Sequence, residues 1–307
     1  MKNYGFIEKI PSDQDIILGV AYPPAPMKVL QANHDWSTYL PLKEYQYNSK
    51  FDTYGCVSFS ALNNIEILLN RCFNDKTNWS DRFLTVLSET KPNVGNYFDR
   101  VANTIQRVGL VKEEVCPFTS DMTQAEYYAT IQEDKVVLGK EFLKKYNVKW
   151  GWVDWAGCDP LILWENLQYG PLQASVYAWG TPVNGVYQRD MTKETNHAIT
   201  IFGGVLLKEF YIFDHYDGVV KRLAWDFYFG SAIRFFIEAN MLRLIKGDTR
   251  PEVYAVGQDG TLHHIAGELS FQEGTKAGIW GDWQSWDTLP QSEVDVMPKG
   301  RAFGFIH

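Results

Sequence analysis

Residues 52–61 read Asp-Thr-Tyr-Gly-Cys-Val-Ser-Phe-Ser-Ala and form the most informative stretch of the chain. A glycine precedes Cys56, and apolar residues at helical spacing follow it as far as residue 72. This pattern predicts a helix over 56–72 with a thiol at its N-terminus. Backbone N–H groups and the helix dipole favour a thiolate there, and a thiolate is the nucleophile of covalent cysteine chemistry. A single cysteine at a helix start is more often inert, so the rest of the chain has to supply its partners.

The remaining pattern predicts an α+β domain with two unlike halves. Helices are expected to begin near Ser80, to cover 97–108 and 161–168, and to occupy part of 124–146. Short strands are expected over 172–177, 198–202 and 210–213. Because helices come first and strands later, the two kinds of element are expected to separate into two halves.

Three regions are expected along the chain. Residues 1–40 are predicted to be an extended lead-in, because the prolines within 22–26 prevent a helix. Residues 41–247 are predicted to be the main domain, and 246–251 has the composition of a linker. Residues 250–307 are predicted to be a small β-containing docking or attachment module, with a hairpin turn at Asp259-Gly260.

Bulk properties exclude several classes of protein. The formal net charge of −8 argues against nucleic acid as a partner, and no window reaches the roughly 18 apolar residues of a membrane span. The N-terminus carries charges and no apolar signal core, so we expect a soluble protein, cytoplasmic or virion-associated. The four cysteines are widely spaced, which favours reduced thiols over a zinc ribbon or disulfide scaffold, and we expect no metal or cofactor.

Two residues stand where partners of a nucleophilic thiol are needed. His197 begins an apolar strand 197 − 56 = 141 residues after Cys56, and Asp214 ends the next strand 214 − 197 = 17 residues later. Adjacent antiparallel strands would place the imidazole beside the carboxylate, which could then fix its tautomer. Each residue also has an ordinary interpretation, His197 as a half-buried histidine and Asp214 as a turn residue.

The order of these residues resembles that of the papain-like cysteine peptidases, in which roughly 130–150 residues separate the cysteine from its downstream partners. Five segments resemble the family in the right order: 41–46, which ends in Gln46, 56–60 at the helix start, 109–118, 170–176, and Asn-His-Ala at 196–198. An ordered set of this kind is more specific than any of its members.

The resemblance implies a two-lobed fold with the active cleft between the helical and β-rich halves. It implies that Cys56 is the nucleophile, His197 the base and Asp214 the group that orients His197. Gln46 and the Cys56 backbone N–H would stabilise the oxyanion. Since the usual orienting residue is a neutral asparagine, the charged Asp214 is expected to hold the imidazolium more strongly.

The chain also departs from the family pattern. Val57 replaces the usual tryptophan, Thr53 replaces a cysteine, and the nine residues between Gln46 and Cys56 make a longer loop than usual. No long helical pro-segment precedes the domain, so self-inhibition is not expected. The segments 80–84 and 109–113 resemble papain-like proteins encoded in bacteriophage structural regions, which implies virion or assembly proteins as partners of the C-terminal module.

Three classes of function remain open from the sequence. The first is a cysteine protease acting on a peptide or protein. The second is a peptidoglycan amidase or endopeptidase acting on cell-wall peptide. The third is a structural or adhesion protein of a virion that keeps the fold while catalysis is unused.

Overall fold

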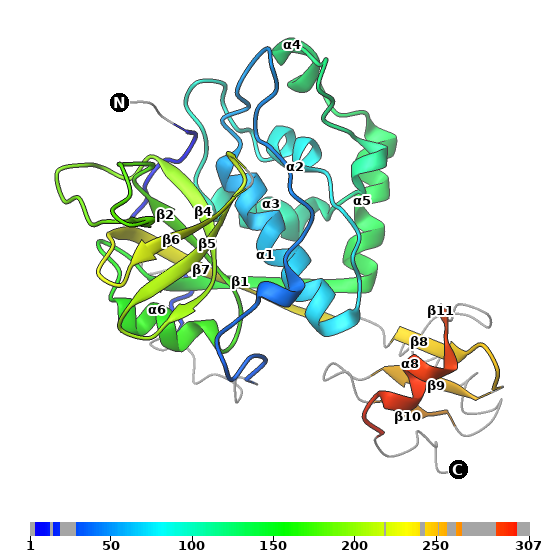
Figure 1. Cartoon of the computed structure of the whole chain (residues 1–307). Helices are drawn as coiled ribbons and strands as arrows, with labels where there is room; N and C mark the ends of the chain where they lie inside the picture. The colour runs from blue at the N-terminus through cyan, green and yellow to red at the C-terminus, as the bar shows by residue number, and fades with distance from the viewer. Residues whose placement is uncertain are drawn as a thin grey trace.

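The computed structural model describes residues 4–12, 15–18, 29–217, 219–239, 243–250, 252–256, 262–265 and 287–299. Within them the chain forms a seven-stranded sheet with helices around it and a separate four-stranded sheet near the C-terminus (Figure 1). The expected turn at Asp259-Gly260 and the prolines of 22–26 lie outside the described residues.

The central helix α1 spans Cys56–Phe73, which confirms the helix predicted from residue 56. It lies between the sheet and the other helices (Figure 1). Gly55 is its N-cap, and Asn74 in left-handed conformation ends it. Most of its side chains are buried, and its apolar face packs with one face of the large sheet in the main core cluster. Burial on this scale stabilises the helix far more than its intrinsic propensity does.

The other helices of the main domain confirm the predicted positions. Ser80 caps α2 (Asp81–Leu87) by accepting a hydrogen bond from the Phe83 N–H at 3.1 Å. Helix α3 (Phe98–Val108) ends at Gly109, where φ is +73° and a side chain would strike the Gly139 carbonyl. The remaining helices are α4 (Gln124–Tyr127), α5 (Glu133–Lys145), α6 (Pro160–Leu167) and the short 3₁₀ turns η1 (Ser37–Tyr39) and η2 (Glu113–Val115).

The large sheet has the order β1-β7-β2-β4-β5-β6-β3. The three predicted strands, β2 (Leu172–Val176), β4 (His197–Val205) and β5 (Glu209–Asp214), are adjacent in it and antiparallel. Strands that the sequence did not predict complete the sheet: β1 (Tyr146–Asp154), β3 (Val186–Tyr187), β6 (Val219–Ala224) and β7 (Phe229–Ala239). One face packs on α1, and the other forms a second core cluster with α6.

The C-terminal sheet has the order β10-β9-β8-β11, and helix α8 (Gln291–Val296) accompanies it. Its strands are β8 (Arg243–Gly247), β9 (Val253–Val256), β10 (Leu262–His264) and β11 (Asp287–Leu289). This sheet therefore begins at residue 243, before the 246–251 segment that the sequence suggested as a linker.

The fold class is the predicted one: an α+β domain with a helical half and a β-rich half that face each other. Among the described residues no helix is both long enough and apolar enough to cross a membrane.

Candidate active site

The two lobes bring the sequence-predicted residues to one place. Cys56 is the first residue of α1, and His197 is the first residue of β4. Asp214 is the last residue of β5, the antiparallel neighbour of β4. His197 Nε2 lies 2.9 Å from Asp214 Oδ1, as the strand pairing suggested. All three side chains have 0% exposure, so any chemistry here takes place away from bulk water in this conformation.

The Asp214 carboxylate is held by four donors. Oδ1 accepts from His197 and from the Tyr216 backbone N–H at 2.9 Å. Oδ2 accepts from Trp179 Nε1 at 2.8 Å and from Lys221 Nζ at 2.7 Å. Burial alone would raise the pKa of this carboxyl, but the His197 ring and the Lys221 ammonium hold it well below its usual range. Asp214 is therefore an ionised carboxylate with both oxygens fixed.

Cys56 lies near Ala198, the residue that follows His197 in β4. His197 Nε2 faces Asp214, while Nδ1 has no hydrogen-bond partner among the described residues and is the ring atom left to exchange a proton. Ala198, the residue after His197, lies in the same core cluster as Cys56, and its backbone N–H acts to lower the pKa of the Cys56 thiol. Burial nevertheless raises the pKa of the Cys56 thiol well above its ordinary value. The thiol is therefore neutral in this conformation, and the thiolate that the helix N-terminus favours would need a more open site.

Gln46 reaches the site although its loop is long. Tyr47 and Asp52 form an antiparallel bridge, and the Thr53 N–H donates to the Gln46 carbonyl at 2.9 Å. The nine residues between Gln46 and Cys56 thus fold back as a hairpin-like loop, and the extra length does not carry Gln46 away from α1. Its side chain is fully buried.

The Gln46 amide is already engaged by the N-terminal segment. Its Nε2 donates to the Tyr4 carbonyl at 3.0 Å and to Asp52 Oδ1 at 3.1 Å. The Tyr4 N–H donates to the Asn196 carbonyl at 3.0 Å, and the Tyr4 ring lies 5.1 Å from the His197 ring. We call residues 4–9 the covering segment, because its first residue lies directly on the candidate base and on the candidate oxyanion donor.

The covering segment continues onto the helical lobe. Gly5 sits against the backbone of Tyr54, so closely that a Cβ on Gly5 would lie 2.0 Å from the Tyr54 carbonyl oxygen. The Asn96 N–H donates to the Gly5 carbonyl, and the Ile7 N–H donates to the Asn96 carbonyl, each at 2.9 Å. Phe6 between them is buried, with 5% exposure. The segment therefore spans from the sheet lobe to the helical lobe.

Two charged side chains fasten its far end. The Glu8 carboxylate accepts from the hydroxyls of Thr195 and Ser231 on the sheet lobe, both at 2.6 Å. Lys9 Nζ lies 2.5 Å from Asp99 Oδ2 of α3. Nothing in the sequence indicated these contacts between residues 4–9 and both lobes.

A third titratable side chain, His215, adjoins the pair. Its ring lies 5.3 Å from the His197 ring, and burial lowers its pKa to about 3, so it is neutral. Possible ligand atoms of His197, Asp214 and His215 lie within 4.8 Å of one another, a grouping that could accept a metal ion. The donors on Asp214, above all the Lys221 ammonium, fill its oxygens and oppose a cation there.

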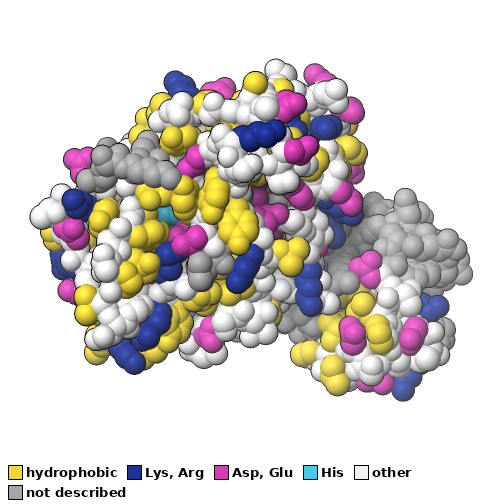
Figure 2. Space-filling view, turned by 45° about the horizontal axis from the view of Figure 1, so that its top comes forward, with side chains coloured by type: hydrophobic (Ala, Val, Ile, Leu, Met, Phe, Trp, Pro, Cys, Tyr) yellow, Lys and Arg dark blue, Asp and Glu magenta, His cyan; other side chains and the backbone are white. Residues whose placement is uncertain are grey.

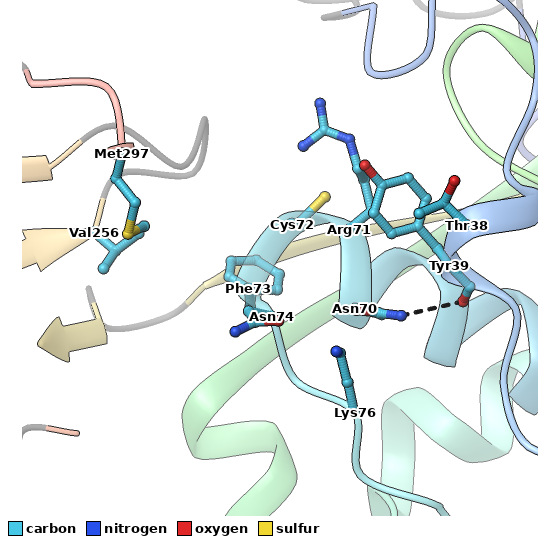
Figure 3. A pocket seen from close by; sticks show the side chains of 10 residues that line it. All are labelled: Thr38, Tyr39, Asn70, Arg71, Cys72, Phe73, Asn74, Lys76, Val256 and Met297. Carbon is cyan, nitrogen blue, oxygen red and sulfur yellow. Dashed lines mark hydrogen bonds between the residues drawn. The ribbon is translucent and has the colours of Figure 1, made fainter. Parts of the chain in front are cut away.

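Two cavities lie elsewhere on the molecule. One of about 340 Å³ is lined by the C-terminal end of α1 and by Val256 and Met297 of the C-terminal region (Figure 3). Cys72 in its wall is roughly 24 Å along the helix from Cys56. The other, of about 320 Å³, contains the carboxyl groups of Glu44, Asp81 and Glu113 on the helical lobe. Neither cavity includes the His197–Asp214 pair.

On the face in Figure 2, basic and acidic side chains are interspersed among neutral and hydrophobic ones. The basic side chains of the described residues form no continuous stripe on that face. This surface has no feature of the electrostatic footprint of a nucleic-acid binder.

Sequence reasoning missed three residues of the site. Tyr4 and Trp179 gave no usable signal, since aromatic residues are common throughout the chain. Lys221 did give a signal. It stands two residues before the buried Leu223 in β6 and so shares its strand face, which places a charge on an apolar face.

Neither a protein-family model nor a curated protein sequence matches the chain. Solved structures do. The proform of the Amb a 11 cysteine protease, a ragweed pollen allergen, aligns with TM-score 0.50 and 16% identity over 71% of this chain and 68% of that chain. Digestive procathepsin L 3 of Tenebrio molitor larval midgut gives 0.49 and 15% over 76% and 75%, and bromelain from Ananas comosus with the E64 inhibitor gives 0.48 and 13% over 66% and 98%.

These structural neighbours are papain-like cysteine proteases, and the predicted papain-like two-lobed fold is confirmed. Identities of this size establish the fold alone, because one fold carries many activities.

Proposed function

We propose that the chain is a cysteine peptidase whose nucleophile is Cys56, and that the conformation described above is latent. The observation that carries the proposal is the His197–Asp214 contact of 2.9 Å, on the strand whose second residue, Ala198, lies in the same core cluster as Cys56. A thiol at a helix N-terminus near an imidazole whose tautomer is fixed by a carboxylate is the arrangement that covalent acyl transfer requires.

The chemistry follows from these positions. The Cys56 proton passes to His197 Nδ1, and the thiolate attacks the carbonyl carbon of a peptide bond, forming an S–C bond. The C–N bond then breaks as His197 returns the proton to the leaving amine. Water, deprotonated by His197, hydrolyses the thioester and restores the thiol. The Cys56 N–H and Gln46 Nε2 donate to the oxyanion, and losing one such donor typically costs ~10²–10³ in rate.

Latency follows from what the covering segment occupies. Gln46 Nε2 has two N–H donors, and it donates to the Tyr4 carbonyl and to Asp52 Oδ1, so neither donor serves an oxyanion in this conformation. A peptide also cannot reach Asn96 and Asn196 while Gly5, Ile7 and Tyr4 use their backbone groups. Catalysis therefore requires that residues 4–9 leave the site, which would also hydrate Cys56 and lower the cost of forming its thiolate.

The substrate class proposed is a peptide or protein. The resemblance of 80–84 and 109–113 to phage-encoded papain-like proteins supports a virion-associated role, with residues 250–307 as the docking module. Cell-wall peptide is the alternative substrate, since a peptidoglycan amidase or endopeptidase uses the same cysteine–histidine chemistry.

A second candidate function is a structural or adhesion protein in which the site is never used. The covered site favours it: Cys56, His197 and Gln46 are fully buried, and both lobes hold the covering segment through hydrogen bonds to its backbone. Under this function the covering segment is a permanent part of the fold.

Hydrolysis assays on a variant whose covering segment is displaced distinguish the candidate functions. Gly5→Ala should force it out, since the new Cβ would meet the Tyr54 carbonyl. We expect this variant to cleave labelled casein and Gly5→Ala/Cys56→Ala to be inactive. Clearing of purified cell wall, lost in the same double variant, would instead identify the amidase. No cleavage of either substrate by folded Gly5→Ala would leave the structural function.

A further inference from the structure

Lys221 is the one buried ammonium beside the proposed catalytic pair in the described part of the chain. Its side chain has 7% exposure, and its Nζ lies 2.7 Å from Asp214 Oδ2, on the side of the carboxylate opposite His197. Asp214 pairs with Val219 across the β5–β6 ladder, so Lys221 holds the diagonal position on the same sheet face. The sheet itself fixes this contact.

The surroundings hold the ammonium in place. The Trp179 ring lies 5.4 Å from Lys221 Nζ, and its Nε1–H donates to the same carboxylate oxygen. Asp217, half exposed, binds Nζ from the solvent side at 2.5 Å. A buried lysine costs free energy unless it is paired, and here Asp214 and Asp217 supply the pairing.

Lys221 changes the charge of the group that His197 faces. A lone buried carboxylate stabilises an imidazolium strongly and would hold the ring protonated. A carboxylate that is paired with an ammonium on its other oxygen still accepts the Nε2–H hydrogen bond, but the buried Asp214–Lys221 pair has a net charge close to zero. The Asp217 carboxylate on the same ammonium is 43% exposed, so water screens its charge. Resting on the peptidase function proposed above, we propose that Lys221 is a positioning residue that makes Asp214 act toward His197 as a neutral acceptor.

From the sequence, Asp214 alone was expected to strengthen the imidazolium; the contact with Lys221 reduces that effect.

Other titratable groups also lie near His197 or its partners, and they are unchanged in all the variants compared below. They are Tyr4 of the covering segment, Asp52 of the Gln46 loop, Cys56 of α1, and His215, Tyr216 and Asp217 after β5.

The test is the NMR titration of the His197 ring, assigned by loss of its signal in His197→Asn. This readout needs no turnover, so failure of the peptidase function and failure of this inference are separate results. Lys221→Met should move the titration midpoint up by about one pH unit, a tenfold gain in proton affinity, and Asp214→Asn should move it down by a similar amount. Asp214→Asn/Lys221→Met should return it to within about half a unit of wild type.

Two controls separate charge from packing. Lys221→Arg keeps the charge and should leave the midpoint near that of wild type. Arg222→Met removes the neighbouring cation of β6, which pairs with Glu209 at 2.6 Å, and should leave it unchanged. If Lys221→Met does not fold, the double variant is compared with Asp214→Asn. The His197 titration midpoint of the double variant should then be higher than that of Asp214→Asn and near that of wild type. A double variant that keeps the shift of either single one, or a folded Lys221→Met with an unmoved midpoint, overturns the inference.

Discussion

Displacement of the covering segment is the prediction that tests the closed site most directly. In Gly5→Ala the added Cβ would lie 2.0 Å from the Tyr54 carbonyl oxygen and 2.4 Å from its carbon. The φ of Gly5 is +107°, which residues with a side chain rarely adopt. Because the obstruction is backbone and cannot rotate away, the segment has to leave the site.

The size of the effect follows from what holds the segment. Its four backbone and amide hydrogen bonds, to Asn196, Gln46 and Asn96, contribute about 1 kcal/mol each. Burial of Phe6 and the hydroxyl contacts of Glu8 add about 2 kcal/mol each. Ordering the six residues of the segment costs about 6 kcal/mol, at about 1 kcal/mol per residue, which leaves a net stabilisation of about 2 kcal/mol. The closed form is then favoured about 30-fold, and its loss should speed access to Cys56 by about that factor.

The assay is alkylation by iodoacetamide, followed by mass spectrometry of the peptide that contains Cys56. Half-buried Cys72, at the far end of α1, is the internal reference and should react at the same rate in every variant. Gly185→Ala is the matched control, because Gly185 also has a positive φ, +76°, but nothing lies within 4 Å of its added Cβ. Thermal unfolding checks that each variant is folded.

A synthetic peptide of residues 1–12 gives the reverse test. Added to Gly5→Ala, it should return the labelling of Cys56 toward the wild-type rate. The reasoning is refuted if folded Gly5→Ala labels Cys56 no faster than Gly185→Ala does.

Two further predictions concern the helical lobe and the oxyanion donor. Burial raises the pKa of Glu113 from 4.5 to about 7. The folded protein therefore holds this proton more tightly than the unfolded chain, and stability falls as the pH rises from about 4.5 through 7. Glu113→Gln should be more stable than wild type at pH 8, by up to about 3 kcal/mol in urea unfolding, and nearly equal to it at pH 4. Glu114→Gln, at the exposed neighbouring residue, is the control, and an equal response of the two variants would contradict the assignment. Gln46→Ala, made in the Gly5→Ala background, should lower kcat for casein by ~10²–10³ with little change in KM, and a loss below about threefold would remove Gln46 from the oxyanion site.

The elements that the sequence predicted correctly have strong local signals. Helix α1 shows apolar residues at helical spacing, Ser80 supplies a cap, and Gly109 supplies a stop. The central strands β2, β4 and β5 are short β-type runs. In each case the residues that decide the conformation lie within the element or next to it.

The elements that were missed depend on distant partners. Strands β1 and β7 pair with each other over most of their length, so each becomes a strand through contact with a segment about 80 residues away. β7 carries Arg234 and small residues among its apolar ones, which blurs the period-two alternation that identifies a strand. Trp150 and Trp152 of β1 pack in the core.

The residues of the candidate site fall into the same two groups, those with a local signal and those that depend on distant partners. The sequence by itself determined that Cys56 begins a helix and that His197 and Asp214 stand at the ends of consecutive strands, because spacing along the chain fixes such local positions. Only the tertiary structure decided that Lys221 binds the second oxygen of Asp214 and that Tyr4 takes the amide of Gln46. Those contacts join lobes and strand faces whose separation in sequence carries no information about distance in space. Whether the thiol is ready to react depends on them, because burial and neighbouring charges set its protonation, and the folded chain alone determines both.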